Sequence, residues 1–185
     1  MTAASGRPRR ADAERNARLL LTAARELFDE QGPGAPLDEI ARRAGVGNAT
    51  LYRHYPTRGD LLVAVYADEV AALCDQGAAL PAETAPGEAF FTWLDAFAVH
   101  VATRRTLAFA GTESDGDRRT ELFERWHSAL TSTAERLLAR AQDAGAVRGD
   151  VTVTEVLALA NAVAASGADP ARVRRLLSIV RDGLT

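Results

Sequence analysis

Apolar residues recur every three or four positions along most of the chain, which is the spacing of one face of an α-helix. In residues 11–31 this face contains Leu20, Ala24, Leu27 and Phe28, and the stretch 32–34 (Gly-Pro-Gly) ends the pattern. No segment shows the strict alternation that is typical of a strand. The periodicity therefore predicts an all-α fold of about nine helices. They are expected at 11–31, 37–44, 48–54, 58–77, 88–103, 104–110, 118–143, 153–165 and 170–184.

Helix-capping residues support several of these boundaries. Thr57 with Asp60 resembles a capping box with Asp in place of Glu, and Thr152 with Glu155 forms a full one. Asp169 is placed to cap a helix that has a proline at its first position.

Composition agrees with helices and excludes several classes of site. The 185 residues include 38 Ala, the strongest helix former, but only 15 Val and Ile together. One Cys excludes an intramolecular disulfide framework and a multi-cysteine zinc site within one chain. All 22 basic residues are Arg, which excludes a Walker-type lysine and a lysine Schiff base. No cofactor or metal is expected.

No segment reaches the roughly 20 apolar residues that a membrane span needs, and no secretory leader is evident. We therefore expect a cytoplasmic protein without a membrane partner. The formal net charge of −3 is unevenly distributed. Residues 1–58 hold ten Arg and seven acidic residues, whereas residues 59–185 hold twelve Arg and eighteen acidic residues. This asymmetry either places a nucleic-acid contact in the first third or is ordinary surface charge.

The segment 37–54 has the form of a helix-turn-helix DNA reader. Two short predicted helices are joined by the turn at 45–47, and Leu51 is expected to anchor the second helix in the core. Asn and Arg side chains pair with base edges, and Thr meets a thymine methyl or a phosphate. The residues that the second helix offers to DNA are Asn48, Thr50, Tyr52, Arg53 and His54.

The stretch IARRAGVGNATLYRHYPTR at 40–58 resembles the DNA-binding region of the tetracycline-repressor (TetR) family of bacterial regulators. The resemblance implies that Asn48 and Thr50 lie near bases and phosphate, that Tyr52 and Arg58 hold phosphates, and that Arg53 and His54 reach bases or backbone. It further implies a palindromic double-stranded DNA operator. Three parts follow: an Arg-containing flexible arm at 1–10, a helix-turn-helix domain at 11–57, and an effector-binding and dimerisation domain at 58–185.

Two positions depart from the common family pattern. Family members often have Thr near Pro36 and Ser at the position of Gly47, and both usually cap a helix and touch phosphate. Those two contacts are not expected here. Arg7, Arg9 and Arg10 either replace them at the backbone or minor groove, or form a disordered tail.

Residues 94–184 resemble the SbtR-type C-terminal domain of the same family, which implies a small-molecule effector site. Trp93, Phe97, His100 and Arg104 fall on one helical stripe that ends in polar residues, as an effector cavity requires. Phe109 and Trp126 are further candidate wall residues. The alternative is that these aromatic residues are plain core.

The resemblance also implies a homodimer formed by the last two helices. The candidate interface residues, which could instead be buried within one protomer, are Val156, Leu159, Ala160, Val163, Leu176, Leu177 and Val180.

An enzyme and a small-molecule carrier without DNA function are the rival classes. None of the three His lies in a metal-binding or catalytic spacing, no nucleophile-elbow sequence occurs, and Cys74 lies among Ala and Leu. We therefore expect no catalytic residues and no metal. The favoured hypothesis is a homodimeric repressor that a small molecule releases from its operator.

Overall fold

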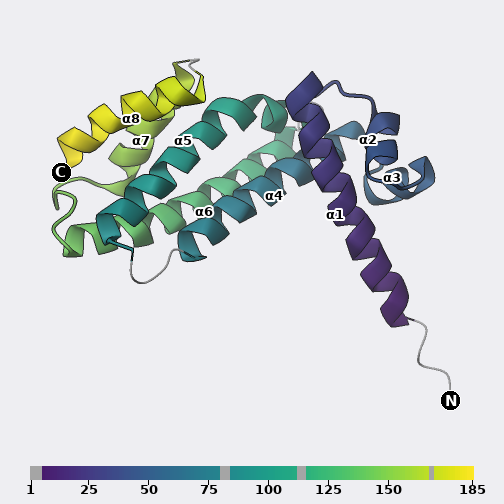
Figure 1. The fold of residues 1–185 in the computed structure, drawn as a ribbon, viewed down its shortest axis with the longest axis horizontal. Helices are drawn as coiled ribbons and strands as arrows, with labels where there is room; N and C mark the ends of the chain where they lie inside the picture. Colours follow the sequence, from purple (N-terminus) through teal and green to yellow (C-terminus); the bar gives the residue numbers. More distant parts are fainter. Residues whose placement is uncertain (1–5, 80–83, 112–115, 167–168) are drawn as a thin grey trace. The chain divides into compact units, whose positions relative to one another are not determined.

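The computed structural model describes residues 6–79, 84–111, 116–166 and 169–185; side chains are not described for 6–10 and 105–120. Every regular element in these ranges is an α-helix, which confirms the predicted all-α class (Figure 1). The helices are α1 (Gly6–Gln31), α2 (Leu37–Arg43), α3 (Asn48–His54), α4 (Arg58–Ala79), α5 (Pro86–Gly111), α6 (Gly116–Asp143), α7 (Val153–Ala165) and α8 (Pro170–Leu184).

The described ranges contain eight helices rather than nine, because the helices predicted at 88–103 and 104–110 are one continuous α5. No Gly or Pro lies between them to end the helix, and the polar run at 103–105 does not break it. The Thr103 hydroxyl donates to the carbonyl of Val99 one turn back, so this polar side chain is satisfied inside the helix. α1 also begins earlier than predicted, at Gly6, so part of the predicted arm is helical.

The chain divides into two compact units. The first unit ends at Tyr66 and includes residues of α5 from Thr106 onward, and the second unit holds the rest. In the first unit α1 packs against both α2 and α3. Its core also takes in the first turns of α4, so this packing continues beyond the boundary predicted at residue 57. The fully buried members of that core, each at 0–1% exposure, are Leu20, Ala24, Leu27, Ala35, Ile40, Ala41, Leu51, Leu61 and Val65.

In the second unit α7 packs against α6 and α8. The helices α4, α5 and α6 approach closely at Gly77, where an added β-carbon would lie 2.6 Å from Thr133 Cγ2 and 2.9 Å from Trp93 Cδ1. Only a residue without a side chain fits there. The Trp93 indole N–H donates to the Leu73 carbonyl at 3.0 Å, which ties α5 to α4.

The predicted helix caps are confirmed. Thr57 and Asp60 bond reciprocally at the start of α4, with the Thr57 amide donating to Asp60 Oδ2 at 3.1 Å. Thr152 and Glu155 form the full capping box of α7. Asp169 accepts from two backbone amides at the start of α8, directly before Pro170. These local bonds fix where the helices begin, so the boundaries were readable from the sequence.

Candidate nucleic-acid interface and effector site

The turn between α2 and α3 sets the angle at which α3 leaves the core. Gly45 has a φ of +69°, a left-handed conformation that glycine adopts without the strain imposed by a β-carbon. The Val46 amide donates to the carbonyl of Ala41 at 3.0 Å, which closes the end of α2. On α3, Leu51 is 1% exposed and joins the core. One anchored face leaves the opposite face of α3 at the surface.

That opposite face carries the predicted DNA-contacting residues. Asn48, Tyr52 and Arg53 are exposed, with Tyr52 at 47%, while Thr50 and His54 are half-buried. Arg53 Nη2 donates to Thr50 Oγ1 at 3.1 Å, a bond between residues three apart on one helix. The His54 and Tyr55 rings have centroids 6.1 Å apart. The surface of α3 therefore presents donors, acceptors and a phenol from consecutive turns.

Neither α2 nor α3 has a side-chain N-cap. Pro36 precedes α2 and Gly47 precedes α3, and neither contributes a capping hydrogen bond, as their departure from the family pattern predicted. Instead, Asn48 Nδ2 donates to Asp38 Oδ1 at 3.0 Å, which links the first residue of α3 to the first turn of α2. The sequence analysis did not identify this bond.

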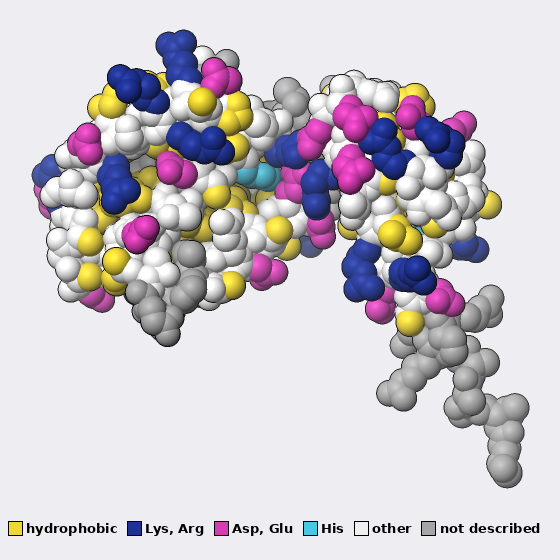
Figure 2. All heavy atoms as spheres, in the orientation of Figure 1, with side chains coloured by type: hydrophobic (Ala, Val, Ile, Leu, Met, Phe, Trp, Pro, Cys, Tyr) yellow, Lys and Arg dark blue, Asp and Glu magenta, His cyan; other side chains and the backbone are white. Residues whose placement is uncertain are grey.

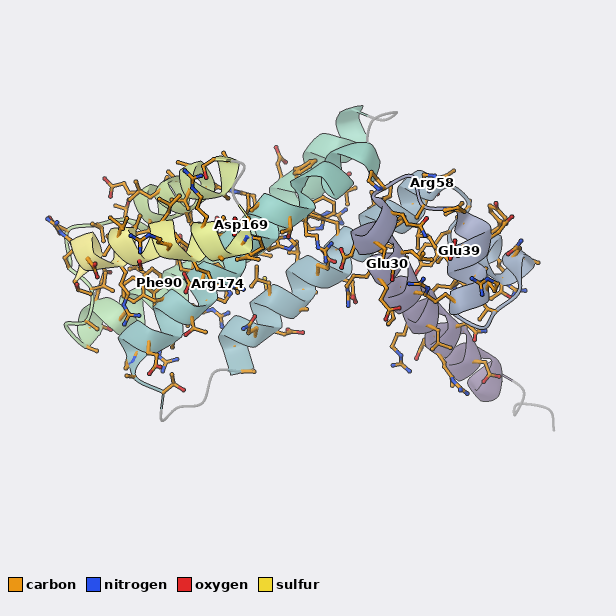
Figure 3. All side chains as sticks on the ribbon, turned by 45° about the horizontal axis from the view of Figure 1, so that its top comes forward. Glu30, Glu39, Arg58, Phe90, Asp169 and Arg174 are labelled. Carbon is orange, nitrogen blue, oxygen red and sulfur yellow. The ribbon has the colours of Figure 1, made fainter. Side chains whose placement is uncertain are left out.

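Arg58 lies at the start of α4 and its side chain is partly buried. Its Nη1 donates to the carbonyls of Pro33, at 3.1 Å, and Ala35, at 2.5 Å (Figure 3). These bonds hold the loop between α1 and α2. In the structure Arg58 therefore holds this loop. Its contact with a DNA phosphate remains a prediction.

An ion-pair network on α1 and α2 was missed by the sequence analysis. Arg43 donates to both carboxylate oxygens of Glu30, at 2.6 and 3.0 Å, and lies within 4.0 Å of Glu26 and Glu39 (Figure 3). Hydrogen bonding to Arg43 lowers the pKa of Glu30, and the same bond raises the pKa of Arg43. Figure 2 accordingly shows acidic and basic side chains interleaved on the face of this unit that it draws.

In the second unit, two members of the predicted effector stripe lie in a packed core. Trp93 is fully buried and Phe97 is 4% exposed. Their rings stack at a centroid distance of 5.6 Å and an interplanar angle of 15°. Trp126 is also buried and meets Phe123 edge-on at 5.4 Å. The side chain of Phe109 lies outside the described residues.

A hollow of about 520 Å³ lies beside this stripe. His100 is the described member of the predicted effector set that lines it. The other lining residues of α5 belong to the stripe next to Trp93 and Phe97. Burial raises the pKa of the Asp95 carboxyl in its wall, and Arg174 and Arg181 partly offset this effect. Its lining residues come from α4, α5 and α8: Gln76, Thr92, Asp95, Ala96, Val99, His100 and Arg174.

A charged cluster joins this hollow to α4. Arg104 Nε lies 3.2 Å from Glu69 Oε2, and His100 Nδ1 lies 4.0 Å from the same oxygen. All three side chains are largely buried: Arg104 is 18% exposed, Glu69 9% and His100 10%. Burial lowers the pKa of His100 from 6.5 to about 4, so its imidazole is neutral at pH 7. A change in the charge of His100 is therefore expected at acid pH and not near neutrality.

Acid should destabilise the second unit through His100. Between pH 6.5 and 4 the unfolded chain binds a proton that the folded chain excludes. The free energy of unfolding should thus fall by up to about 1.4 kcal/mol per pH unit as the pH is lowered. His100→Asn should flatten this dependence in chemical denaturation measured across that range. Equal slopes for the wild type and His100→Asn would contradict the assignment.

The candidate dimer residues divide into two groups. Val156, Ala160 and Leu177 are 0–3% exposed within the single chain, so they belong to the core of their own protomer. Leu159 is 46% exposed, and Val163, Leu176 and Val180 are half-buried. Ile179, which the sequence analysis did not include, is 61% exposed and is an apolar surface residue of α8.

None of the described helices combines the length and apolarity needed to cross a membrane.

Comparison with known proteins identifies the family. Residues 20–65 match the model of bacterial regulatory proteins of the TetR family, and residues 85–185 match the C-terminal domain of SbtR-like transcriptional regulators. These matches cover the helix-turn-helix and most of the second unit. The chain therefore belongs to the TetR family of bacterial transcriptional regulators, with an SbtR-like C-terminal domain.

Solved structures agree over nearly the whole chain. A TetR transcriptional regulator from Streptomyces coelicolor is 35% identical, covers 91% of this chain and 97% of its own, and superposes with a TM-score of 0.77. A TetR transcription regulatory protein from Mycobacterium vanbaalenii is 38% identical over 95% of this chain and 98% of its own, with a TM-score of 0.75. An HTH-type transcriptional regulator of Staphylococcus aureus is 40% identical over 53 residues, which is 28% of this chain and 29% of that protein.

Proposed function

We propose that this regulator is a homodimeric, cytoplasmic repressor that binds a palindromic double-stranded DNA operator through α3 and is released by a small-molecule effector. The observation that carries the proposal is the exposed face of α3, anchored by Leu51 and bearing Asn48, Tyr52 and Arg53. Repression and effector release are typical of the family. Residues 11–57 would form the DNA-binding domain, and residues 58–185 would form the effector-binding and dimerisation domain. No catalytic role is proposed.

Base reading is assigned to Asn48 and Arg53, with Thr50, Tyr52 and His54 on bases or phosphate and Arg58 on phosphate. Asn and Arg can each make paired hydrogen bonds to one base edge in the major groove. A two-fold symmetric dimer would place its two copies of α3 in successive major grooves, about 34 to 36 Å apart or somewhat more. The two-fold symmetry of the dimer requires a palindromic site.

Selection of bound duplexes from a randomised pool tests this function. Arg53→Ala should lose discrimination at one defined base pair by about 1 to 3 kcal/mol, because a base-pairing guanidinium is removed. Arg136→Ala on α6 removes the same charge from an exposed site in the second unit and should leave the selected sequence unchanged. An unchanged consensus for Arg53→Ala would make Arg53 a backbone or solvent residue. Failure to retain generic DNA at low salt would favour a carrier without DNA function.

We assign dimerisation to the exposed apolar side chains of α7 and α8, namely Leu159 and Ile179 with the half-buried Val163, Leu176 and Val180. A second copy of this chain is the occupant, since members of this family act as dimers. Val156, Ala160 and Leu177 would support this surface from beneath.

Ile179→Asp should dissociate the dimer while the protomer stays folded. The side chain is 61% exposed in the protomer, so the charge is costly only where a partner buries it. Sedimentation should show a monomer with unchanged helical content and weakened operator binding. Ser132→Asp, which places the same charge on an exposed position of α6, is the control and should remain dimeric. A dimeric Ile179→Asp variant would place the interface elsewhere.

The hollow lined by Thr92, Asp95, His100 and Arg174 is the site we propose for the effector. Its walls combine apolar side chains with a carboxylate and a guanidinium, which is the usual make-up of a small-molecule site. His100 both lines the hollow and lies 4.0 Å from Glu69 of α4, so an occupant could shift α4 through this contact. Coupling of about 1 to 3 kcal/mol would suffice for release.

A further inference from the structure

The amide of Asn48 is held by a carboxylate from a different helix. Asn48 is the first residue of α3 and Asp38 is the second residue of α2, and Asn48 Nδ2 donates to Asp38 Oδ1 at 3.0 Å. We infer that Asp38 is a positioning residue that fixes the orientation of the Asn48 amide and thereby sets a preference for adenine at the base that Asn48 reads. The inference rests on the proposed function, which places α3 in the major groove.

The carboxylate decides which way the amide points. An ionised carboxylate only accepts hydrogen bonds, so it pairs with the amide nitrogen and repels the amide oxygen. A half-turn of the Asn48 amide would bring Oδ1 against Asp38 Oδ1 and lose the 3.0 Å bond. The residue before Asn48, Gly47, has no side chain to compete for the amide or to cap α3. Asp38 therefore selects one of two amide orientations before DNA arrives.

The selected orientation matches adenine. With one N–H held by Asp38, the amide retains its oxygen as an acceptor and its second N–H as a donor. In the major groove adenine offers the complementary pair, a donor at N6 and an acceptor at N7. Guanine offers two acceptors, O6 and N7, so one of them would face the amide oxygen. A freely turning amide could instead donate alone to either purine, with less discrimination.

The charge of Asp38 has a second, separable consequence. Its side chain is exposed beside the DNA-reading helix, so its carboxylate opposes the phosphates of any bound duplex. Asp38→Asn removes this charge and replaces the acceptor-only carboxylate with an amide that both accepts and donates. Asp38→Ala removes both the charge and the acceptor. Both variants lack the charge, so a difference between them reports the hydrogen bond to Asn48.

The experiment uses the full chain and a randomised pool of duplex DNA, followed by affinities for the selected consensus and for a duplex with the Asn48-dependent A·T pair changed to G·C. The base pair is identified as the one that loses preference in Asn48→Ala. The wild type should discriminate by roughly 5- to 150-fold, as a good paired contact does. Asp38→Ala should lose most of that ratio. Asp38→Asn should retain only part of the ratio, because its amide can also donate to the oxygen of a turned Asn48 amide, while it binds both duplexes more tightly.

A double variant shows whether Asp38 acts through Asn48. In the Asn48→Ala background, Asp38→Ala should leave the A·T to G·C ratio unchanged, although it still raises affinity for both duplexes. Circular dichroism would confirm that each variant is folded, which is expected because both side chains are exposed.

Each contrary outcome identifies what failed. Full discrimination in Asp38→Ala would overturn the positioning role while leaving Asn48 as a base reader. A consensus unaffected by Asn48→Ala, or a preference for G·C at its position, would overturn the inference together with the assignment of Asn48. A pool that yields no consensus at all would instead overturn the proposed function.

Discussion

Phe97→Ala should lower the free energy of unfolding by about 3 to 5 kcal/mol, the loss that follows removal of a fully packed phenyl ring. The ring is 4% exposed and stacks on Trp93 at 5.6 Å, so it has packing partners on all sides. Trp93 is itself fixed by its hydrogen bond to the Leu73 carbonyl of α4. The truncation would thus leave a cavity beside the Trp93 ring, which is held in place. Thermal and chemical unfolding both measure this loss.

Val99→Ala is the matched control from the same helix. Val99 is half-buried and lines the hollow, so its truncation should cost roughly 1 kcal/mol or less, by area lost. A small loss for Phe97→Ala, accompanied by operator binding that a cell extract no longer relieves, would contradict the packing argument. It would place the effector against the Trp93–Phe97 stripe instead of in the hollow.

Much of the fold was predictable because short-range chemistry sets the helix ends. The capping pairs at Thr57 and Thr152 and the Asp169-Pro170 start are contacts within one turn, so sequence spacing specifies them. The continuity of α5 was not predicted. The polar run at 103–105 resembles a boundary, but charged and hydroxyl side chains do not end a helix when no Gly or Pro follows.

The candidate sites were only partly predictable, because periodicity gives the face of a helix but not what covers it. Trp93 and Phe97 lie on the stripe that packs inward, whereas the hollow uses the neighbouring stripe of α5 together with Gln76 of α4 and Arg174 of α8. Such a combination depends on how three helices pack. It carries no signal in any single segment.

Contacts between elements were likewise out of reach of the sequence. Arg58 matched a phosphate-binding position of the family, yet its Nη1 holds two loop carbonyls more than 20 residues away in sequence. Asp38 and Asn48 are ten residues apart and meet only because the Gly45 turn folds α3 back toward α2. Ile179 lies off the apolar stripe of α8, and that isolated position was the available sign of an exposed apolar surface.

Arg104→Met should destabilise the second unit by about 3 to 5 kcal/mol, because it removes a cation from a buried carboxylate. Arg104 Nε lies 3.2 Å from Glu69 Oε2, and the Glu69 side chain is only 9% exposed. The neutral imidazole of His100, at 4.0 Å from the same oxygen, does not supply the missing charge. Chemical denaturation of the full chain at neutral pH measures the change.

The double variant Glu69→Met with Arg104→Met distinguishes a charge effect from lost packing. If the penalty of the single variant comes from the charge of the buried Glu69 carboxylate, removing that carboxylate as well should recover most of the stability, since well-packed apolar replacements of buried ion pairs are often neutral or stabilising. A double variant as unstable as Arg104→Met would show that the aliphatic stem of Arg104 matters more than its charge. If stability is recovered but effector release is weakened, the ion pair also has a role in coupling the hollow to α4.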